Sequence, residues 1–283
     1  MAYQNFIPSV WAEAINRELE RDCIFAEDCN REYEGSVKNK GESVTILGVG
    51  KPTIKTVAKA SRNNDIDAAE EIESSSVVMY IDQERYFNYA VGDIDKAQAE
   101  KGLMDALSRE SAEGLANAVD TYIAGLAADG KKQYATAPKL VCGTAGSGEK
   151  NVLDALDDAI TALRLNDVSG STRIVIDMSW NMYKLFRREY QKLDTDNSEE
   201  IKNGKMGMYA GCVVKCSNNG AKDSGGNELI MVRTQKAIAY AQPLTHTEAY
   251  RPEKKFSDAV KGFILFGAKI VRPKELVVLN VKY

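Results

Sequence analysis

Hydrophobic residues recur at helical spacing in two long segments of the chain. Residues 8–22 carry Trp11, Ile15 and Leu19 at four-residue intervals, which predicts a terminal helix with a single apolar stripe. Residues 93–129 contain no proline and are rich in Ala, Leu, Glu and Lys, so they predict a helix about 50 Å long. The terminal helix needs a surface to pack on, which is either a neighbouring subunit or the protein's own core.

Between these two helices, short apolar patches alternate with polar residues around a long charged stretch. This pattern is typical of a two-stranded ribbon with a solvated tip, and a plain solvated loop is the alternative. The charges are sorted, basic on the outgoing half and acidic on the return half: Lys51, Lys55, Lys59 and Arg62, then Asp65, Asp67, Glu70, Glu71 and Glu73. An isolated ribbon is only marginally stable in water, so this one is predicted to contact another surface.

The rest of the chain mixes helices and strands without a regular βα repeat, which predicts an α+β fold. Apolar periodicity predicts helices over residues 151–165 and through Trp180 to Phe186, with a short strand at residues 173–176 between them. Further strands are predicted at residues 208–215, 228–232, 237–241, 246–250, 263–271 and 276–281.

Composition narrows the class of protein. A chain of 283 residues with 44% hydrophobic and 28% charged residues can bury a core without metal or disulfide support. Its formal net charge of -4 argues against a protein whose main task is to grip a polyanion, because that task needs clustered Lys and Arg. No segment approaches the roughly 20 apolar residues of a membrane span, and the N-terminus does not have the pattern of a signal peptide.

The five cysteines predict neither a disulfide framework nor a zinc site, because their number is odd and none stands in C-x-x-C spacing. Cys212 and Cys216 are four residues apart in a predicted strand, so we expect them on one face as small reduced hydrophobes.

The best lead for enzyme chemistry is the glycine-rich segment from Gly143 to Lys150. A phosphate-binding loop needs Lys directly after the last glycine and then Ser or Thr, but Glu149 intervenes and Asn151 stands in the hydroxyl position. A catalytic triad would need a nucleophile elbow such as G-x-S-x-G beside the single histidine, His246, and the sequence contains none. His246 is predicted to lie in an ordinary exposed strand or turn. Neither segment therefore predicts a catalytic or cofactor site.

Two charged helix faces remain as weaker leads. Asp154, Asp157 and Asp158 share one face, which indicates a solvated surface more than a paired-acid site. Basic residues around Arg187 and Arg188 lie close to tyrosines, a combination that binds nucleic acids, but nearby acidic residues favour ion pairs within the protein. No cluster of histidines predicts a metal site.

Four segments, in their order and spacing, carry a resemblance to a known family. They are residues 7–11, 30–44, 86–98 and 207–214. Together they resemble the major capsid proteins of tailed bacteriophages, which have the HK97-like fold, and the likeness covers nearly the whole chain. None of the four segments is catalytic.

The resemblance implies an architecture. Residues 1–35 would be an N-arm and residues 36–92 an extended loop. Residues 93–140 and 240–283 would form a peripheral domain with a spine helix, and residues 141–239 an axial domain. Subunits of this family assemble in the host cytoplasm into pentamers and hexamers of an icosahedral shell around double-stranded DNA. The chain begins directly at the arm helix, so a separate scaffolding protein is implied as a partner beside the portal protein.

The residues predicted to make assembly contacts are Trp11 on the terminal helix and the sorted charges Lys51, Lys55, Lys59, Arg62, Glu70, Glu71 and Glu73 on the ribbon. No cofactor, metal or membrane is implied. Three other interpretations stay open: an encapsulin-like cellular compartment with the same fold, a small soluble hydrolase or nucleotide-binding enzyme, and another virion protein such as a tail component, which the long predicted helix disfavours.

Overall fold

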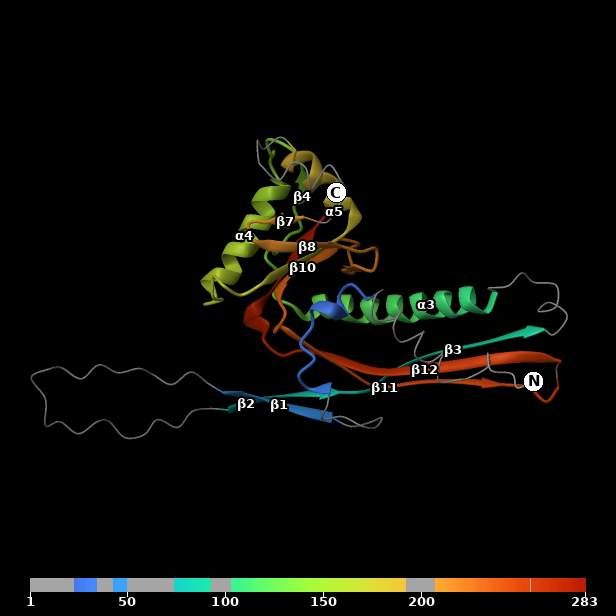
Figure 1. The fold of residues 1–283 in the computed structure, drawn as a ribbon. Coiled ribbons are helices and arrows are strands. Elements are labelled where there is room, and N and C mark those ends of the chain that lie inside the picture. Colours follow the sequence, from blue (N-terminus) through green and yellow to red (C-terminus); the bar gives the residue numbers. More distant parts are fainter. Residues whose placement is uncertain (1–22, 35–42, 50–73, 93–102, 192–206, 255) are drawn as a thin grey trace, which may run out of the picture.

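The structure is a computed structural model that describes residues 23–34, 43–49, 74–92, 103–191, 207–254 and 256–283. Two separate sheets lie on opposite sides of a long helix, α3 (Leu103–Gly125), as Figure 1 shows. A two-stranded ribbon leaves the lower of these sheets at one end.

The upper sheet has six strands in the order β13-β10-β6-β8-β7, with β9 paired to β10. Its strands are β6 (Ile174–Met178), β7 (Met208–Tyr209), β8 (Cys212–Cys216), β9 (Ala221–Lys222), β10 (Glu228–Thr234) and β13 (Leu276–Val281). The pair β6–β8 is parallel, and the other pairs are antiparallel. Both faces of the sheet are covered, which is why β6, β10 and β13 are buried along their whole length.

Two helices, α4 (Val152–Leu165) and α5 (Trp180–Tyr190), cover one face of this six-stranded sheet. The side chains of Asn151 and Ser179 cap them by accepting hydrogen bonds from backbone N–H groups in the first turn. A short parallel pair, β4 (Lys139–Val141) and β5 (Glu149–Asn151), precedes α4.

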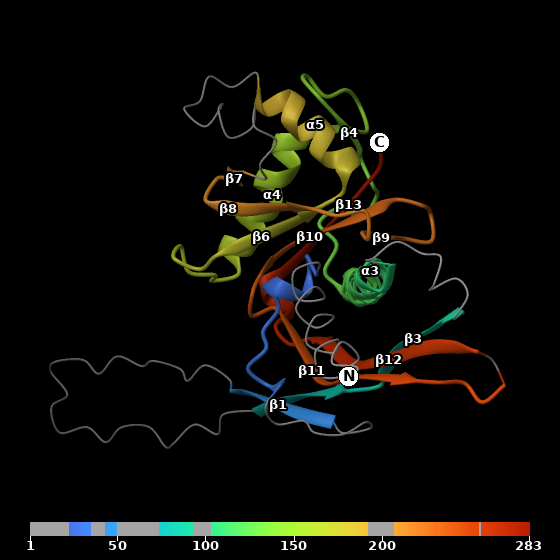
Figure 2. The same ribbon diagram turned by 45° about the vertical axis from the view of Figure 1, so that its right-hand side comes forward.

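The lower sheet has three long antiparallel strands in the order β11-β12-β3. They are β3 (Gln83–Gly92), β11 (Ile238–Tyr250) and β12 (Ser257–Ile270). The helix α3 and the 3₁₀ turn η3 (Leu126–Asp129) lie against one face, where Phe266 of β12 meets Tyr122 of α3 edge to face at 5.5 Å. Figure 2 looks nearly along α3 and shows it between the two sheets.

The ribbon consists of β1 (Ser43–Val49) and β2 (Ser74–Tyr80), which pair antiparallel with Val44 opposite Met79. The short turns η1 (Ala26–Asp28) and η4 (Pro273–Glu275) complete the described elements.

Most of the predicted elements between residues 103 and 283 are confirmed, and two details of the prediction are wrong. Residues 208–215 are not one strand: Ala210 and Gly211 adopt positive φ values of 48° and 75°, so β7 and β8 form a hairpin with a tight turn. The strands predicted at 237–241 and 246–250 are one strand, β11, with a register shift between Ala241 and Leu244.

Three other predictions concern boundaries. The helix predicted at residues 8–22 and the first turns of the helix predicted at 93–129 lie outside the described residues. The ribbon pairing is confirmed for β1 and β2, but residues 83–92 form the edge strand β3 of the three-stranded sheet. The strand β13 pairs with β10, so the chain returns to the upper sheet at its end. The division into peripheral and axial domains stays a prediction.

Candidate assembly surfaces

The eight residues predicted to make assembly contacts all lie outside the described residues. These residues are Trp11, Lys51, Lys55, Lys59, Arg62, Glu70, Glu71 and Glu73. Their contacts therefore stay predictions. The structure does describe the attachment of the ribbon, the uncovered part of the three-stranded sheet and the segment that follows residue 22.

The ribbon is attached to the three-stranded sheet through a small apolar cluster, which we call the ribbon-base cluster. Its members are Ile46, Met79 and Ile81 from the ribbon side and Ala239, Ala241 and Leu265 from the sheet. Met79 of β2 and Ile81, which directly follows β2, are completely buried, although the ribbon itself has only two strands. Burying an aliphatic side chain contributes about 1.5–3 kcal/mol, so this cluster fixes the base of the ribbon on the sheet.

Beyond the ribbon base, the same face of the sheet is not covered by other described residues. The register places Tyr86, Phe263 and His246 side by side in one row across β3, β12 and β11. Tyr86 is 78% exposed, and the His246 ring lies 5.8 Å from the Phe263 ring between centroids. We call this surface the open face.

The next row of the open face is polar. It consists of Asn88, Lys261 and Glu248. The Lys261 ammonium lies 3.1 Å from the Glu248 carboxylate and 5.0 Å from the centre of the Tyr250 ring, whose hydroxyl donates to Asn88 at 3.1 Å. A shallow groove of about 340 Å³ runs between the two rows. The open face thus combines aromatic surface with hydrogen-bonding groups, which is the composition of protein interfaces.

The segment from Cys23 to Asn30, the N-terminal anchor, is held inside the protein. A single carboxylate on α3, that of Asp120, accepts hydrogen bonds from the backbone N–H groups of Ile24 at 2.7 Å, Phe25 at 3.0 Å and Ala26 at 3.3 Å. The Phe25 side chain is buried in the core shared by α3 and the two sheets. At the other end of the anchor, the backbone of Asn30 bonds to Ile238 and Tyr240 of β11.

A buried ion pair from the upper sheet completes this attachment. Arg233 of β10 is fully buried, and its Nε lies 2.7 Å from the Asp177 carboxylate on β6. The rest of its guanidinium donates to the backbone of the anchor, through Nη1 to the carbonyl of Asp28 and through Nη2 to that of Phe25 at 2.9 Å. A guanidinium that is paired and fully hydrogen-bonded is the form in which a charge can be buried at acceptable cost.

A second cation, Lys215 of β8, secures the anchor from the adjacent strand. Its ammonium lies 2.6 Å from Asp28 and 2.5 Å from Glu27, and Arg173 approaches Asp28 at 3.3 Å. Cations on β10 and β8, together with Arg173 directly before β6, therefore hold the N-terminal anchor against the upper sheet.

Opposing effects set the pKa values in this cluster. Burial raises the pKa of the Asp28 carboxyl, but hydrogen bonds from Lys215 and Gln235 and the nearby charges outweigh it, so the pKa lies below its ordinary value of 3.8. For Asp120 and Asp177, burial dominates over the hydrogen bonds and over Arg233, and both pKa values are raised. Burial lowers the pKa of the Lys215 ammonium, but the carboxylates of Asp28 and Glu27 outweigh it by favouring the ammonium form, so the pKa lies above its ordinary value.

The sequence and the fold can be compared with those of known proteins. No protein-family model matches the chain, and no curated protein matches it. Solved structures do. A structure from Mycobacterium phage Che8 is 29% identical, with 91% of each chain covered and a TM-score of 0.67. The capsid structure of the cyanophage P-SCSP1u is 15% identical, covers 92% of this chain and 88% of its own, and also has a TM-score of 0.67.

The chain shares its fold with phage capsid structures, and these similarities support the expected phage major capsid protein with an HK97-like fold. A virus-like particle from Pyrococcus furiosus shares the fold at 11% identity, with a TM-score of 0.57 and coverage of 96% of this chain and 98% of its own. No helix among the described residues of the capsid protein is long and apolar enough to cross a membrane.

The glycine-rich segment from Gly143 to Lys150 has a structural role in this protein. The Glu149 carboxylate, which breaks the phosphate-loop pattern, accepts the Gly146 N–H at 3.1 Å and so closes the turn on itself. Asn151 caps α4 and also donates to the Gly143 carbonyl at 2.8 Å. Residues 143–148 form a turn between β4 and β5.

The acidic face of α4 in the capsid protein is used for tyrosine contacts. The Tyr209 hydroxyl donates to Asp157 at 2.9 Å, and the Tyr134 hydroxyl donates to Asp158 at 2.8 Å. Asp158 also pairs with Lys150 at 2.7 Å. Asp157 and Asp158 therefore bind different partners within the protein.

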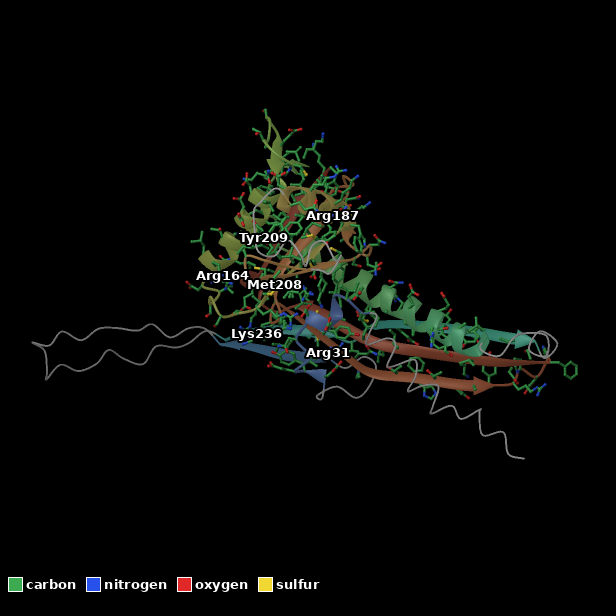
Figure 3. The ribbon with its side chains drawn as sticks, turned by 45° about the horizontal axis from the view of Figure 1, so that its top comes forward. Arg31, Arg164, Arg187, Met208, Tyr209 and Lys236 are labelled. Atoms are coloured by element: carbon green, nitrogen blue, oxygen red, sulfur yellow. The ribbon has the colours of Figure 1, made fainter. Side chains whose placement is uncertain are left out.

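The basic face of α5 lies apart from Arg31 and Lys236, two other cations of the protein (Figure 3). Lys184, Arg187 and Arg188 are exposed. Figure 3 shows Arg187 high in the upper part of the molecule, whereas Arg31 and Lys236 lie near its junction with the lower sheet. Cys212 and Cys216 are both buried on one face of β8, as predicted, and no group of possible metal ligands occurs within the described ranges.

The sequence pattern did not predict the buried ion pair of Arg233 and Asp177. Arg233 and Asp177 each stand in an otherwise apolar strand, Leu229–Arg233 and Ile174–Asp177. A charge at an alternate position of such a strand points to the same layer as its apolar neighbours, so it must find a partner there. That signal indicates a buried pair, but it does not name the partner.

Proposed function

We propose that this capsid protein assembles with copies of itself into a closed icosahedral shell of pentamers and hexamers, located in the virion capsid around double-stranded DNA. The observation that carries the proposal is the likeness to phage capsid structures over nine-tenths of the chain. The open face supports it, because an aromatic row at the surface of a sheet is suited to contact with a neighbouring subunit.

The sorted charges of the ribbon give the proposed assembly contact. Basic residues such as Lys59 and Arg62 precede an acidic run that ends at Glu73. We therefore expect each half of the ribbon to contact a surface of opposite charge on a neighbouring subunit. A single exposed ion pair contributes only about 0–1 kcal/mol. A shell repeats the same contact on every subunit, and weak contacts let misplaced subunits leave. We further propose a separate scaffolding protein, the portal protein as a partner, and assembly in the host cytoplasm.

Particle formation tests the proposed shell directly. The full chain is expressed with and without the gene upstream of its own, then examined by size-exclusion chromatography and negative-stain microscopy. We expect capsomers or closed particles, with closure improved by the co-expressed protein. A stable monomer or dimer under both conditions would contradict assembly and would favour the soluble-enzyme interpretation.

Charge reversal tests the contact of the ribbon. We expect the double change Lys59→Glu and Arg62→Glu to slow assembly, most strongly at low salt, because it replaces attraction by repulsion and salt screens both. Light scattering follows the rate across salt concentrations. A matched control reverses two exposed lysines in the connection after η3, Lys131→Glu and Lys132→Glu. Equal rates for the ribbon variant and the wild type at all salt concentrations would rule out electrostatic docking.

A cellular compartment shell is the second candidate, favoured by the nearly complete coverage of the virus-like particle from Pyrococcus furiosus. The likeness at 11% identity concerns the fold alone. The content of purified particles separates the two candidates: packaged DNA supports the virion, and a co-purified enzyme supports the compartment. Neighbouring genes for a portal and a terminase, or for a cargo enzyme, give the same distinction.

A further inference from the structure

The end of β2 crosses the three-stranded sheet over Gly267 of β12. A Cβ atom at Gly267 would lie 2.3 Å from the carbonyl oxygen of Tyr80 and 3.1 Å from its carbonyl carbon. It would also lie 3.0 Å from Cδ1 of Ile81. The closest of these three atoms, and one of the other two, are backbone atoms at the end of β2, which cannot rotate away as a side chain can. The absence of a side chain at Gly267 is therefore what allows this crossing.

The surroundings of Gly267 are shaped for a close approach. Gly267 pairs with Ala241, and the neighbouring position of β11 on the same face is Ala239, so the sheet offers a floor of small residues. The register of β11 shifts directly after Ala241. Such an irregularity bends a strand and strengthens its local twist. Met79 and Ile81 lie buried on this floor, on either side of the crossing carbonyl of Tyr80.

A network of hydrogen bonds stabilises the irregular part of β11. The backbone N–H of Gln242 donates to the Glu34 carboxylate at 3.1 Å, and its side-chain amide donates to Thr245 at 3.0 Å. The Tyr240 hydroxyl donates to the side chain of Gln242 at 2.6 Å. These hydrogen bonds tie the floor beneath the ribbon to its neighbours.

We propose that Gly267 is a positioning residue that sets the angle at which the ribbon leaves its subunit, and thereby the geometry of the shell. The inference rests on the proposed assembly function, and it assigns a cause within the subunit to the direction of the ribbon. An added Cβ must move the Tyr80 carbonyl by about 1 Å to reach ordinary contact. The seven-residue strands extend about 20 Å beyond this point, so a small tilt at the base becomes a displacement of several Å at their end.

The test is the variant Gly267→Ala in the full chain, with Gly114→Ala as its matched control. Gly114 lies on α3, and a Cβ there would meet nothing within 4 Å. We expect Gly114→Ala to form wild-type shells. We expect Gly267→Ala to fold, with a cooperative thermal transition, and to form at least tenfold fewer closed particles of wild-type diameter. Wild-type yield and diameter for Gly267→Ala would overturn the proposal.

A second comparison guards against a variant that fails to fold. Ile81→Ala opens space beside the crossing but leaves Gly267 unchanged, so we expect it to keep the wild-type particle diameter. Adding Gly267→Ala to Ile81→Ala tests the Cβ in a background where the ribbon has room to move. Here we expect a folded subunit whose particles are few or aberrant. Equal assembly of the single and the double variant would overturn the proposal.

A distance measurement separates failure of this inference from failure of the proposed function. Spin labels at the exposed positions Thr45 of β1 and Glu113 of α3 report the angle of the ribbon in unassembled subunits. We expect the mean distance to shift in Gly267→Ala and to stay unchanged in Gly114→Ala, whether or not shells form. An unchanged distance in Gly267→Ala contradicts the positioning role. Absence of shells from the wild type contradicts only the proposed function.

Discussion

The two sheets of this protein differ in what they leave for neighbours. Every residue of β6, β10 and β13 in the six-stranded sheet is buried, because helices cover one face and α3 with the N-terminal anchor covers the other. In the three-stranded sheet, β3 alternates between exposed and half-buried residues for most of its length. The first sheet completes its own core, whereas the second presents a surface that another molecule can complete.

Ion pairs show the same difference. Arg233 and Asp177 are fully buried in the six-stranded sheet, where removing one partner leaves the other charge without water or a counterion. Lys261 and Glu248 on the open face are each about half exposed, so water and salt weaken their attraction. The same chemical contact therefore serves stability in one sheet and surface complementarity in the other. Three predictions test this contrast, from the largest expected effect to the smallest.

Removing the buried cation has the largest expected effect. The change Arg233→Met leaves Asp177 and two backbone carbonyls of the anchor without their donor, so we expect a loss of about 3–5 kcal/mol in the free energy of unfolding. Urea unfolding of unassembled subunits measures it. Arg173→Met is the control, because Arg173 is about half exposed and its loss costs about 0–1 kcal/mol. Equal losses for both variants would contradict the contrast.

Acidification has a smaller expected effect, through Asp28. The pKa of this carboxyl is below its ordinary value of 3.8 in the folded protein, so its stabilising effect is present above that value and is lost as the pH falls through the folded pKa. We expect Asp28→Asn to cost about 1–3 kcal/mol at neutral pH, and the difference from the wild type to shrink below about pH 4. Thermal unfolding as a function of pH measures this difference.

Two neighbouring acids oppose this trend and must be considered in the same titration. Burial raises the pKa values of Asp120 and Asp177, so these groups bind protons at a higher pH when folded than when unfolded, and protonation favours the folded state. The comparison of Asp28→Asn with the wild type removes their contribution, because both proteins retain them. Glu27→Gln is the control, since Glu27 is mostly exposed. A difference that stays constant at all pH values would contradict the role of Asp28.

Truncating the open face has the smallest expected effect on the subunit itself. Tyr86 is 78% exposed, so we expect Tyr86→Ser to change the free energy of unfolding by less than about 0.5 kcal/mol. Particle yield should fall, because the row with Phe263 and His246 loses its largest side chain. The control Tyr86→Phe retains the ring and should assemble normally. A subunit destabilised as strongly as by Arg233→Met would show that this face belongs to the core.

Local periodicity was sufficient for the elements that short-range spacing defines. The apolar side of α4 and the hydrophobic run of β13 follow from residues a few positions apart. The turn at Ala210 and Gly211 was missed, because the apolar pattern of residues 208–215 continues through it. The join of two predicted strands into β11 was missed because Gln242 and Pro243 interrupt the apolar pattern without ending the strand.

By itself, the sequence determined that this protein has an α+β fold with a ribbon, a long helix and no recognisable catalytic motif, since these features depend on composition and on neighbours within a few residues. Only the tertiary structure decided which distant residues meet. Arg233 reaches Asp177 across 56 residues of chain, and Tyr80 rests on Gly267. Such contacts depend on the path of the chain through space, which local periodicity does not encode, and they hold the N-terminal anchor and direct the ribbon.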